Sequence, residues 1–232
     1  ANILQAKDIL AQLSKKQQPF FFAVGIAKPH LPFVAPKKYW DLYKRSDIVL
    51  EPFQEQSTNP ISVAYHNAGE IRAYTDIPAD IAATQQKGFG LALSSEKQKE
   101  LIHGYMAATS YMDAQVGLLL DKLEALDLED NTVVILWGDH GFHLGDHGLW
   151  TKHTNFEQAV RSPMIISAPQ GFSANKNNIP TEFVDIFPTL CELTNLDIPA
   201  HLPGKSLVSL MKDPNASLRF AALSQYPRGG RR

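Results

Sequence analysis

Residues 132–156, TVVILWGDHGFHLGDHGLWTKHTNF, decide the fold expected for this chain. They open with an apolar run at 133–137 that is β-branched at its start. Such a run favours a strand buried on both faces, as in a parallel sheet covered by helices. Asp139 and His140 follow at once, and ligands of open α/β sheets bind beyond the carboxyl ends of strands. The segment therefore predicts a metal-binding or catalytic corner at the end of this strand.

The loop that follows is crowded with polar side chains. Residues 139–153 hold four histidines, two aspartates and one lysine, more than a helix cap beside a surface histidine would account for. His143 and His147 stand four apart, the spacing of a zinc pair on a helix. Three glycines in the loop disfavour that helix, since each costs about 1 kcal/mol relative to alanine, and no His-Glu-x-x-His occurs. The loop is interpreted as a site, and a catalytic site is favoured over a zincin.

A second apolar run, at 20–27, predicts another strand, which ends in Lys28-Pro29-His30-Leu31-Pro32. Each proline fixes its own φ and pushes the preceding residue to extended geometry. Lys28 and His30 are therefore expected on a stiff loop at a strand's carboxyl end, although an ordinary polar loop would have the same local sequence.

Other elements follow from periodicity and capping signals. An apolar stripe at three- and four-residue steps predicts the longest helix at 95–126, with Ser94 or Ser95 as its cap. Shorter helices are expected at 3–16 and 36–43, and a third strand at 164–168. Asp185 is expected to cap a further helix, in which Cys191 is buried packing.

Composition indicates one domain spanning residues 1–232, with no internal repeat. Residues 47–95 read as a weakly patterned insertion near the pocket. The net charge of −2 gives no sign of a nucleic-acid partner, and no apolar stretch is long enough to cross a membrane. The single cysteine excludes an intrachain disulfide. The sequence does not predict an oligomeric state.

Several motifs in order along the chain carry a family resemblance. They are DHGFHLGDHGLWTKHTNF at 139–156, FFFAVGIAKPHLPF at 20–33, YMAATSYMDAQVGLLLDKL at 105–123, FVDIFPTLCEL at 183–193 and SQYPR at 224–228. Each motif alone is weak, and the ordered set is strong. The chain resembles the formylglycine-dependent type I sulfatases, most closely their iduronate-2-sulfatase branch. This resemblance implies an α/β fold of the alkaline phosphatase and sulfatase type, a sheet sandwiched by helices, of which this chain is the middle-to-later portion.

The resemblance also implies site residues and a cofactor. Asp139 and His140 match metal ligands of the family, where the metal is calcium. His30 and Lys152 match the sulfate-contacting histidine and lysine, which are the expected catalytic residues. Lys28 and His153 complete the expected substrate-binding set. The family nucleophile is a formylglycine made in a Cys/Ser-x-Pro-x-Arg motif, which this chain lacks. It is expected in an N-terminal segment absent from this sequence, and the chain alone is expected to have negligible activity.

Two questions stay open at this point. Calcium prefers oxygen ligands, so from chemistry alone His140 argues equally for Zn²⁺ or Mn²⁺. The expected function is hydrolysis of a sulfuric ester on a sulfated sugar or uronic acid. The alternatives are a phosphatase or phosphodiesterase of the same superfamily, and a carbohydrate-binding remnant without activity. The resemblance also implies an exported protein (periplasmic, extracellular or lysosomal), although the chain shows no signal peptide.

Overall fold

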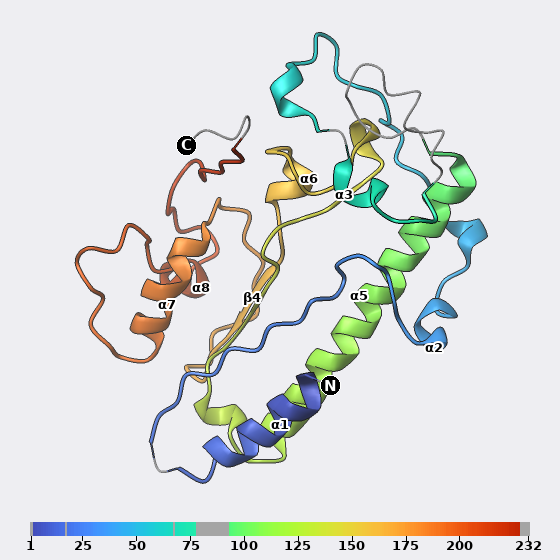
Figure 1. Ribbon diagram of the computed structural model, residues 1–232. Helices are drawn as coiled ribbons and strands as arrows, with labels where there is room; N and C mark the ends of the chain where they lie inside the picture. Colours follow the sequence, from blue (N-terminus) through green and yellow to red (C-terminus); the bar gives the residue numbers. More distant parts are fainter. Residues whose placement is uncertain (1, 17, 67, 78–92, 228–232) are drawn as a thin grey trace. The chain divides into compact units, whose positions relative to one another are not determined.

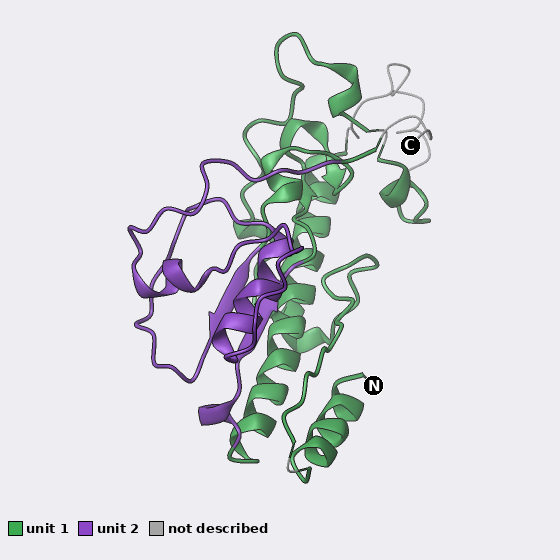
Figure 2. Ribbon diagram, turned by 90° about the vertical axis from the view of Figure 1, so that its left-hand side faces the viewer, with its two compact units in different colours: residues 1–127, 139–162, 226–232 green, residues 128–138, 163–225 purple. Residues whose placement is uncertain are grey.

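The structure, a computed structural model, describes residues 2–16, 18–66, 68–77 and 93–227 (Figure 1). These residues group into two compact units, which Figure 2 draws in green (unit 1) and purple (unit 2). Unit 1 comprises residues 1–127, 139–162 and 226–232, and unit 2 comprises residues 128–138 and 163–225. The expectation of a single domain over residues 1–232 stays a prediction.

Unit 1 is mainly helical. Its elements are α1 (Asn2–Leu13), α2 (Lys37–Trp40), η1 (Arg45–Asp47), η2 (Ser62–Ala64), α3 (Gly69–Arg72), α5 (Ser95–Glu124), β2 (His143–Leu144), η4 (Asp146–Gly148), β3 (Trp150–Thr151) and α6 (Glu157–Val160). Unit 2 contains η3 (Glu129–Asn131), β1 (Val134–Trp137), β4 (Met164–Ser167), η5 (Phe183–Asp185), α7 (Ile186–Leu193) and α8 (Val208–Lys212).

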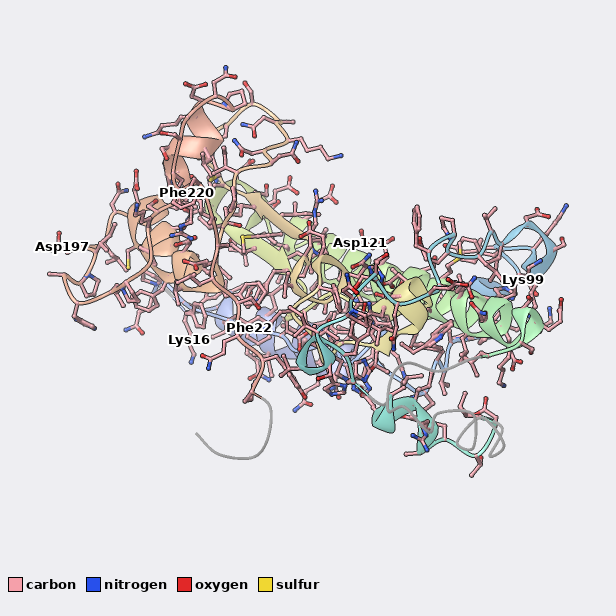
Figure 3. The ribbon with its side chains drawn as sticks, turned by 90° about the horizontal axis from the view of Figure 1, so that it is seen from above. Lys16, Phe22, Lys99, Asp121, Asp197 and Phe220 are labelled. Carbon is pink, nitrogen blue, oxygen red and sulfur yellow. The ribbon has the colours of Figure 1, made fainter. Side chains whose placement is uncertain are left out.

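Helix α5 confirms the strongest sequence prediction. The Ser94 hydroxyl accepts the Lys97 N–H at 3.3 Å, as an N-cap should. The helix rises about 1.5 Å per residue, so Lys99 and Asp121 lie far apart along it (Figure 3). Close packing against the 33–40 segment explains Gly104, because a Cβ there would lie 3.0 Å from Phe33 and from Trp40.

A hydrophobic cluster in unit 1 joins the segments that carry the predicted site. Its members come from the 28–33 loop, α3, β3, α5 and the residues flanking α3 and α5: Leu31, Ala68, Ile71, Ile77, Leu93, Leu101 and Trp150. Trp150 is 1% exposed, and Ile71 and Ala68 are fully buried. Full burial of a large apolar side chain stabilises a fold by about 1.5–3 kcal/mol. This core therefore fixes the backbones next to His30, Glu70 and Lys152.

The strand predicted at 133–137 is confirmed, but its pairing differs from the expectation. β1 pairs with β4 in antiparallel register, Val134 opposite Ser167 and Trp137 opposite Met164. Trp137 is 44% exposed, so β1 is not buried on both faces within the described residues. A continuous apolar run reports burial but says nothing of the neighbour's direction, which is why the parallel prediction was wrong.

The strand predicted at 20–27 does not form within the part of the chain that the structure describes. These residues carry no strand assignment, and Figure 1 draws them as a tube. Exposure alternates along them, with Phe21 80% exposed. A strand exists only where a neighbour accepts its backbone hydrogen bonds, and none of the described segments pairs with this one.

The remaining predictions are mostly confirmed. The helices expected at 3–16 and 36–43 are present as α1 and the shorter α2, and the third strand is β4. Cys191 is buried in α7, as expected. The insertion at 47–95 contains only short helical turns where it is described, and its residues 78–92 lie outside the described part. None of the described helices is long and apolar enough to span a bilayer.

Asp185 does not cap α7 as expected. Its carboxylate accepts the N–H of Glu182, forming a capping box around η5, and the N–H of Lys205, both at 2.8 Å. It also binds Arg219 through two hydrogen bonds of 2.6 and 2.7 Å. The fully buried side chain therefore ties the start of α7 to two later segments of unit 2.

Candidate functional site

Three predicted site residues surround one carboxylate in unit 1. The Lys152 ammonium donates to Glu70 Oε1 and lies 2.9 Å from His30 Nε2. His30 Nε2 is in turn 3.0 Å from Glu70 Oε1. His153 Nδ1 approaches the other carboxylate oxygen, Oε2, at 3.7 Å. The structure thus brings His30, Lys152 and His153 together, and adds Glu70, which the sequence did not indicate.

The members of this cluster come from three segments of the chain. His30 lies in the loop at 28–32, whose two prolyl bonds are cis. Glu70 belongs to α3, and Lys152 and His153 directly follow β3. All three segments have neighbours in the buried cluster around Trp150 and Ile71. The cluster therefore depends on tertiary packing between distant residues; Lys152 and His30, for example, lie 122 positions apart.

Hydrogen bonding fixes the tautomer of His30. Its Nδ1 lies 2.7 Å from the carbonyl oxygen of Leu31, which can only accept, so Nδ1 carries the proton. In the neutral ring, Nε2 then presents a lone pair, which accepts from the Lys152 ammonium. When His30 is protonated, Nε2–H donates instead, and Glu70 Oε1 is a ready acceptor.

Glu70 stays ionised beside these groups. Burial by itself raises the pKa of its carboxyl, but the hydrogen bond and charge of Lys152 act in the opposite direction. His153 and His30 add to the charge effect, and the net result holds the pKa of Glu70 below its ordinary value. The side chains of Glu70 and Lys152 are only 19% and 16% exposed, so solvent screens their attraction weakly.

Lys28 lies beside this cluster in sequence, but its contacts are with its own loop. Its ammonium donates to the carbonyl oxygens of His30 at 3.1 Å and Pro32 at 2.5 Å. Burial lowers the pKa of this ammonium. Lys28 therefore braces the loop that presents His30, and its expected contact with substrate stays a prediction.

A buried network shapes the loop that carries Lys152. His143 is fully buried, and its Nδ1 donates to Asp146 Oδ2 at 2.5 Å. Its Nε2 then accepts from the Thr154 hydroxyl at 2.7 Å, and that hydroxyl accepts the N–H of Phe156 at 3.2 Å. Asp146 and Thr154 flank Lys152 on either side in the chain. His143 is thus a structural brace with both ring nitrogens occupied. It does not share an α-helix with His147, because His143 lies in a β hairpin and the backbone of His147 has a left-handed φ of 53°.

Thr151, the residue before Lys152, has an unusual backbone conformation. It is fully buried with φ of 78°, a region that β-branched residues rarely occupy. Such a conformation costs on the order of 1–3 kcal/mol and persists only where the surroundings impose it. Here the β2–β3 pairing holds Thr151 opposite His143. The direction in which Lys152 leaves the hairpin is therefore set by the fold.

The predicted metal ligands, Asp139 and His140, lie side by side in unit 1. His140 donates Nδ1–H to the Gly141 carbonyl at 2.7 Å, which leaves the Nε2 lone pair for a cation. Nε2 lies 3.6 Å from Asp139 Oδ1, and the Asp139 side chain is 87% exposed. Two ligands at right angles on one calcium are roughly 3.4 Å apart, so the pair fits part of a metal site. The described residues offer no group of three His, Cys, Asp or Glu side chains around a common point.

Gly141 holds this corner in place by close packing. Its N–H donates to the Ala159 carbonyl at 2.7 Å, and an added Cβ would lie 2.1 Å from the Gln158 carbonyl oxygen. No side chain larger than hydrogen fits there. The backbone that orients His140 is therefore fixed against α6.

Comparison with protein families identifies the chain. The family model described as Sulfatase matches residues 3–196. A sulfatase of Formosa agariphila is 33% identical over 219 residues, covering 94% of this chain and 41% of that protein. Iduronate 2-sulfatase of Homo sapiens is 31% identical over 269 residues, covering 97% of this chain and 48% of that protein. The chain thus spans less than half the length of these relatives.

Solved structures agree on the fold. An enzyme in complex with its substrate D-glucosamine-2-N,6-O-disulfate superposes with a TM-score of 0.74 at 18% identity, covering 94% of this chain and 53% of that one. A phosphonate monoester hydrolase from Silicibacter pomeroyi gives 0.71 at 23% identity, covering 91% and 41%. The α/β fold expected from the sequence, of the alkaline phosphatase and sulfatase type, is confirmed. The chain belongs to the sulfatase family.

Proposed function

We propose that this chain carries the sulfate-contacting part of a sulfuric ester hydrolase. The observation that carries the proposal is the meeting of Lys152, His30 and His153 around one carboxylate, Glu70. Donors that converge on a carboxylate are also suited to the oxygens of a sulfuryl group, since both are anionic acceptors. Because the chain belongs to the sulfatase family, the reaction that we expect at this anion site is sulfuric ester hydrolysis.

Lys152 supplies fixed positive charge in this proposal. Sulfate ester hydrolysis builds negative charge on the sulfuryl oxygens and on the leaving oxygen. An ammonium that is already oriented stabilises such charge without reorganising at the moment of reaction. Lys152 is oriented by Glu70, by His30 and by the buried hairpin beneath it. Its proposed role is to bind and stabilise the sulfuryl group.

His30 and His153 provide titratable donors next to Lys152. A histidine can hold or release a proton near neutral pH. The Nδ1 proton of His30 is committed to Leu31, so Nε2 is the atom that can face a leaving oxygen. We assign His30 to proton delivery at that atom and His153 to substrate contact, while Lys28 supports the His30 loop.

The proposal includes one divalent metal, calcium, bound in part by Asp139 and His140. Bound there, the metal would supply positive charge near the reacting sulfate. The chain's own contribution is two adjacent donor atoms, with the ring of His140 oriented by a backbone carbonyl. The proposal also keeps the formylglycine nucleophile that the family resemblance implies, which no motif of this chain supplies.

The proposed substrate class is a sulfated sugar or uronic acid, in a protein exported from the cytoplasm. Relatives named iduronate 2-sulfatase and N-acetylglucosamine-6-O-sulfatase support the carbohydrate. A relative named choline-sulfatase shows that the family extends beyond sugars. The alternative reaction is phosphonate or phosphate ester hydrolysis. The structural likeness to a phosphonate monoester hydrolase is the reason to test it.

A comparison of substrates tests the proposal directly. The full-length protein is assayed with an aryl sulfate, a 2-O-sulfated uronide and an aryl phosphonate monoester. We expect kcat/KM to be highest for a sulfate ester and to fall when Lys152 is replaced. A higher kcat/KM for the phosphonate would favour the alternative reaction. Binding of sulfated sugar without turnover of any ester would favour a carbohydrate-binding remnant.

A further inference from the structure

We propose that Glu70 is the positioning residue of this site. Its carboxylate holds the Lys152 ammonium against His30, so that both side chains face one sulfuryl group. The inference rests on the proposed function, because it concerns how the sulfate site is assembled. It adds a residue that neither the motifs of the chain nor the predicted site contain. It also assigns a role to the 47–95 segment, which contributes α3 to the site.

The donor inventory of Lys152 supports a positioning role. An ammonium has three N–H donors, and it sits on a flexible four-carbon stem. In the described part of the chain, one donor goes to Glu70 Oε1 and another to His30 Nε2. One donor is left for a ligand. Two fixed contacts define the direction of the third, which is the direction from which a sulfuryl oxygen can bind.

Glu70 can act as an anchor because its own backbone is fixed. It sits between Gly69 and Ile71 in the four-residue helix α3. Ile71 and the preceding Ala68 are both fully buried, and both belong to the hydrophobic cluster with Trp150. A shift of α3 would disturb that core. Lys152, His30 and His153 surround the Glu70 carboxylate.

One of the two oxygens of the Glu70 carboxylate lacks a hydrogen-bond partner in the part of the chain that the structure describes. Glu70 Oε2 is buried and accepts no hydrogen bond within the described residues; His153 Nδ1 stays at 3.7 Å. Buried polar atoms without a hydrogen bond are uncommon in native proteins and call for an explanation. The value of this oxygen lies in the negative charge that it places between a lysine and two histidines.

A second role for the same geometry makes the opposite prediction. Glu70 could occupy the position of a sulfate oxygen and compete with substrate for the same donors. Neutralising a competitor would tighten substrate binding and lower KM. Neutralising a positioning residue would misplace Lys152 and lower kcat, because misplacements of about 1 Å cost catalysis up to a hundredfold. The burial of Ile71 in α3, and of Ala68 just before it, favours positioning, because a backbone movement that withdrew Glu70 would disturb the hydrophobic cluster around Trp150.

The test compares Glu70→Gln, Glu70→Asp and the matched control Glu55→Gln in the full-length protein. Glu55 lies in the same segment and is exposed. We expect Glu70→Gln to lower kcat by about tenfold or more while KM changes much less. Glu70→Asp keeps the charge and should retain more turnover than Glu70→Gln, and Glu55→Gln should match the wild type. Thermal unfolding of each variant separates loss of folding from loss of positioning. Wild-type kcat in Glu70→Gln, or a lower KM with kcat unchanged, would overturn the proposal.

A spectroscopic measurement keeps this inference separate from the proposed function. The ¹⁵N shifts of the His30 ring report the hydrogen bonds at Nδ1 and Nε2, and a His30→Asn variant assigns them. We expect Glu70→Gln to shift the His30 Nε2 signal, and Glu55→Gln to leave it unchanged. Should the wild type hydrolyse no sulfate ester, the proposed function fails, and this signal alone decides the role of Glu70. An unchanged Nε2 signal in Glu70→Gln would overturn it.

Discussion

The Lys152 ammonium lies 2.9 Å from Nε2 of His30, although 122 residues separate the two in the chain. Each comes from a separate loop, one after β3 and the other at 28–32. The hydrophobic cluster beneath both loops includes Leu31 next to His30 and Trp150 close to Lys152. The two side chains therefore meet because the fold brings two loops together, and they are suited to act on one ligand.

This meeting predicts energetic coupling between Lys152 and His30. Removing one preorganised donor costs about 3–4 kcal/mol at the transition state, roughly a hundred- to a thousandfold in turnover. When two groups act on the same ligand, removing both lowers the catalytic rate by less than the product of the two single losses. For the full-length protein, we therefore expect the double variant Lys152→Ala/His30→Ala to lose less kcat/KM than the product of the two single losses. Multiplicative losses would show that the residues act independently.

His143 is predicted to matter for stability. It is fully buried and hydrogen-bonded at both ring nitrogens, to Asp146 and Thr154. His143→Ala would leave the buried Asp146 without its main partner, at a cost of about 3 kcal/mol in the free energy of unfolding. Denaturant unfolding measures this, with the exposed His201→Ala as the control. Equal stability of the two variants would contradict the bracing role.

Asp185 is predicted to make stability depend on acid pH. Burial by itself raises its pKa, but hydrogen bonds from Arg219, Lys205 and Glu182 outweigh burial and lower the pKa overall. The Asp185 carboxyl therefore binds a proton more readily in the unfolded state than in the folded state. As a result, the free energy of unfolding rises with pH between the folded and the unfolded pKa of this group. The stabilisation is complete above the unfolded pKa of about 3.9 and is lost as the pH falls through the folded value.

Asp185→Asn tests this dependence. At neutral pH the change leaves Arg219, whose side chain is 11% exposed, without its main charge partner. Breaking a buried ion pair in this way costs about 3–5 kcal/mol. The difference from wild type should shrink as the pH falls below about 4. The exposed Asp197→Asn is the control (Figure 3). A difference that is constant from pH 7 to pH 3 would refute the linkage.

Metal binding tests the corner formed by Asp139 and His140. If they are ligands, Asp139→Ala should weaken Ca²⁺ binding by the full-length protein at least tenfold, since a carboxylate is a principal calcium ligand. Calorimetric titration with Ca²⁺, and then with Zn²⁺ and Mn²⁺, measures both affinity and metal preference. The exposed Asp130→Ala should bind as the wild type does. Unchanged affinity in Asp139→Ala would remove this residue from the metal site.

Local patterns in the sequence predicted the elements whose cause is local. The apolar stripe and the Ser94 cap gave α5 almost to the residue, because periodicity and capping act within a few positions. The apolar runs at 20–27 and 133–137 were less informative. Extended backbone is a local property, whereas strand pairing and its direction depend on a neighbour from elsewhere in the chain. This is why β1 was predicted with the wrong partner direction.

The site residues divide in the same way, into those with a local sequence signal and those without one. His30, Lys152 and His153 were found from ordered motifs, and the structure brings them together. Glu70 was missed because it sits in a segment with little periodicity, where a lone acidic residue carries no signal of its own. Arg219, which binds Asp185, was missed for the same reason. Partners contributed by weakly patterned segments become visible only once packing places them.

Replacement of Lys152 is the most direct test of the central claim, that this cluster binds the sulfuryl group. The measurement is kcat for an aryl sulfate with the full-length protein carrying Lys152→Ala, beside Lys37→Ala as the control. Lys37 is 84% exposed and pairs only with Asp41 within the described residues. The account predicts a loss of at least about a hundredfold for Lys152→Ala, a variant that is still folded at the assay temperature, and near wild-type kcat for Lys37→Ala. If Lys152→Ala retains more than about half of the wild-type kcat, where loss of such a donor should cost far more, the assignment of this cluster to sulfate is wrong.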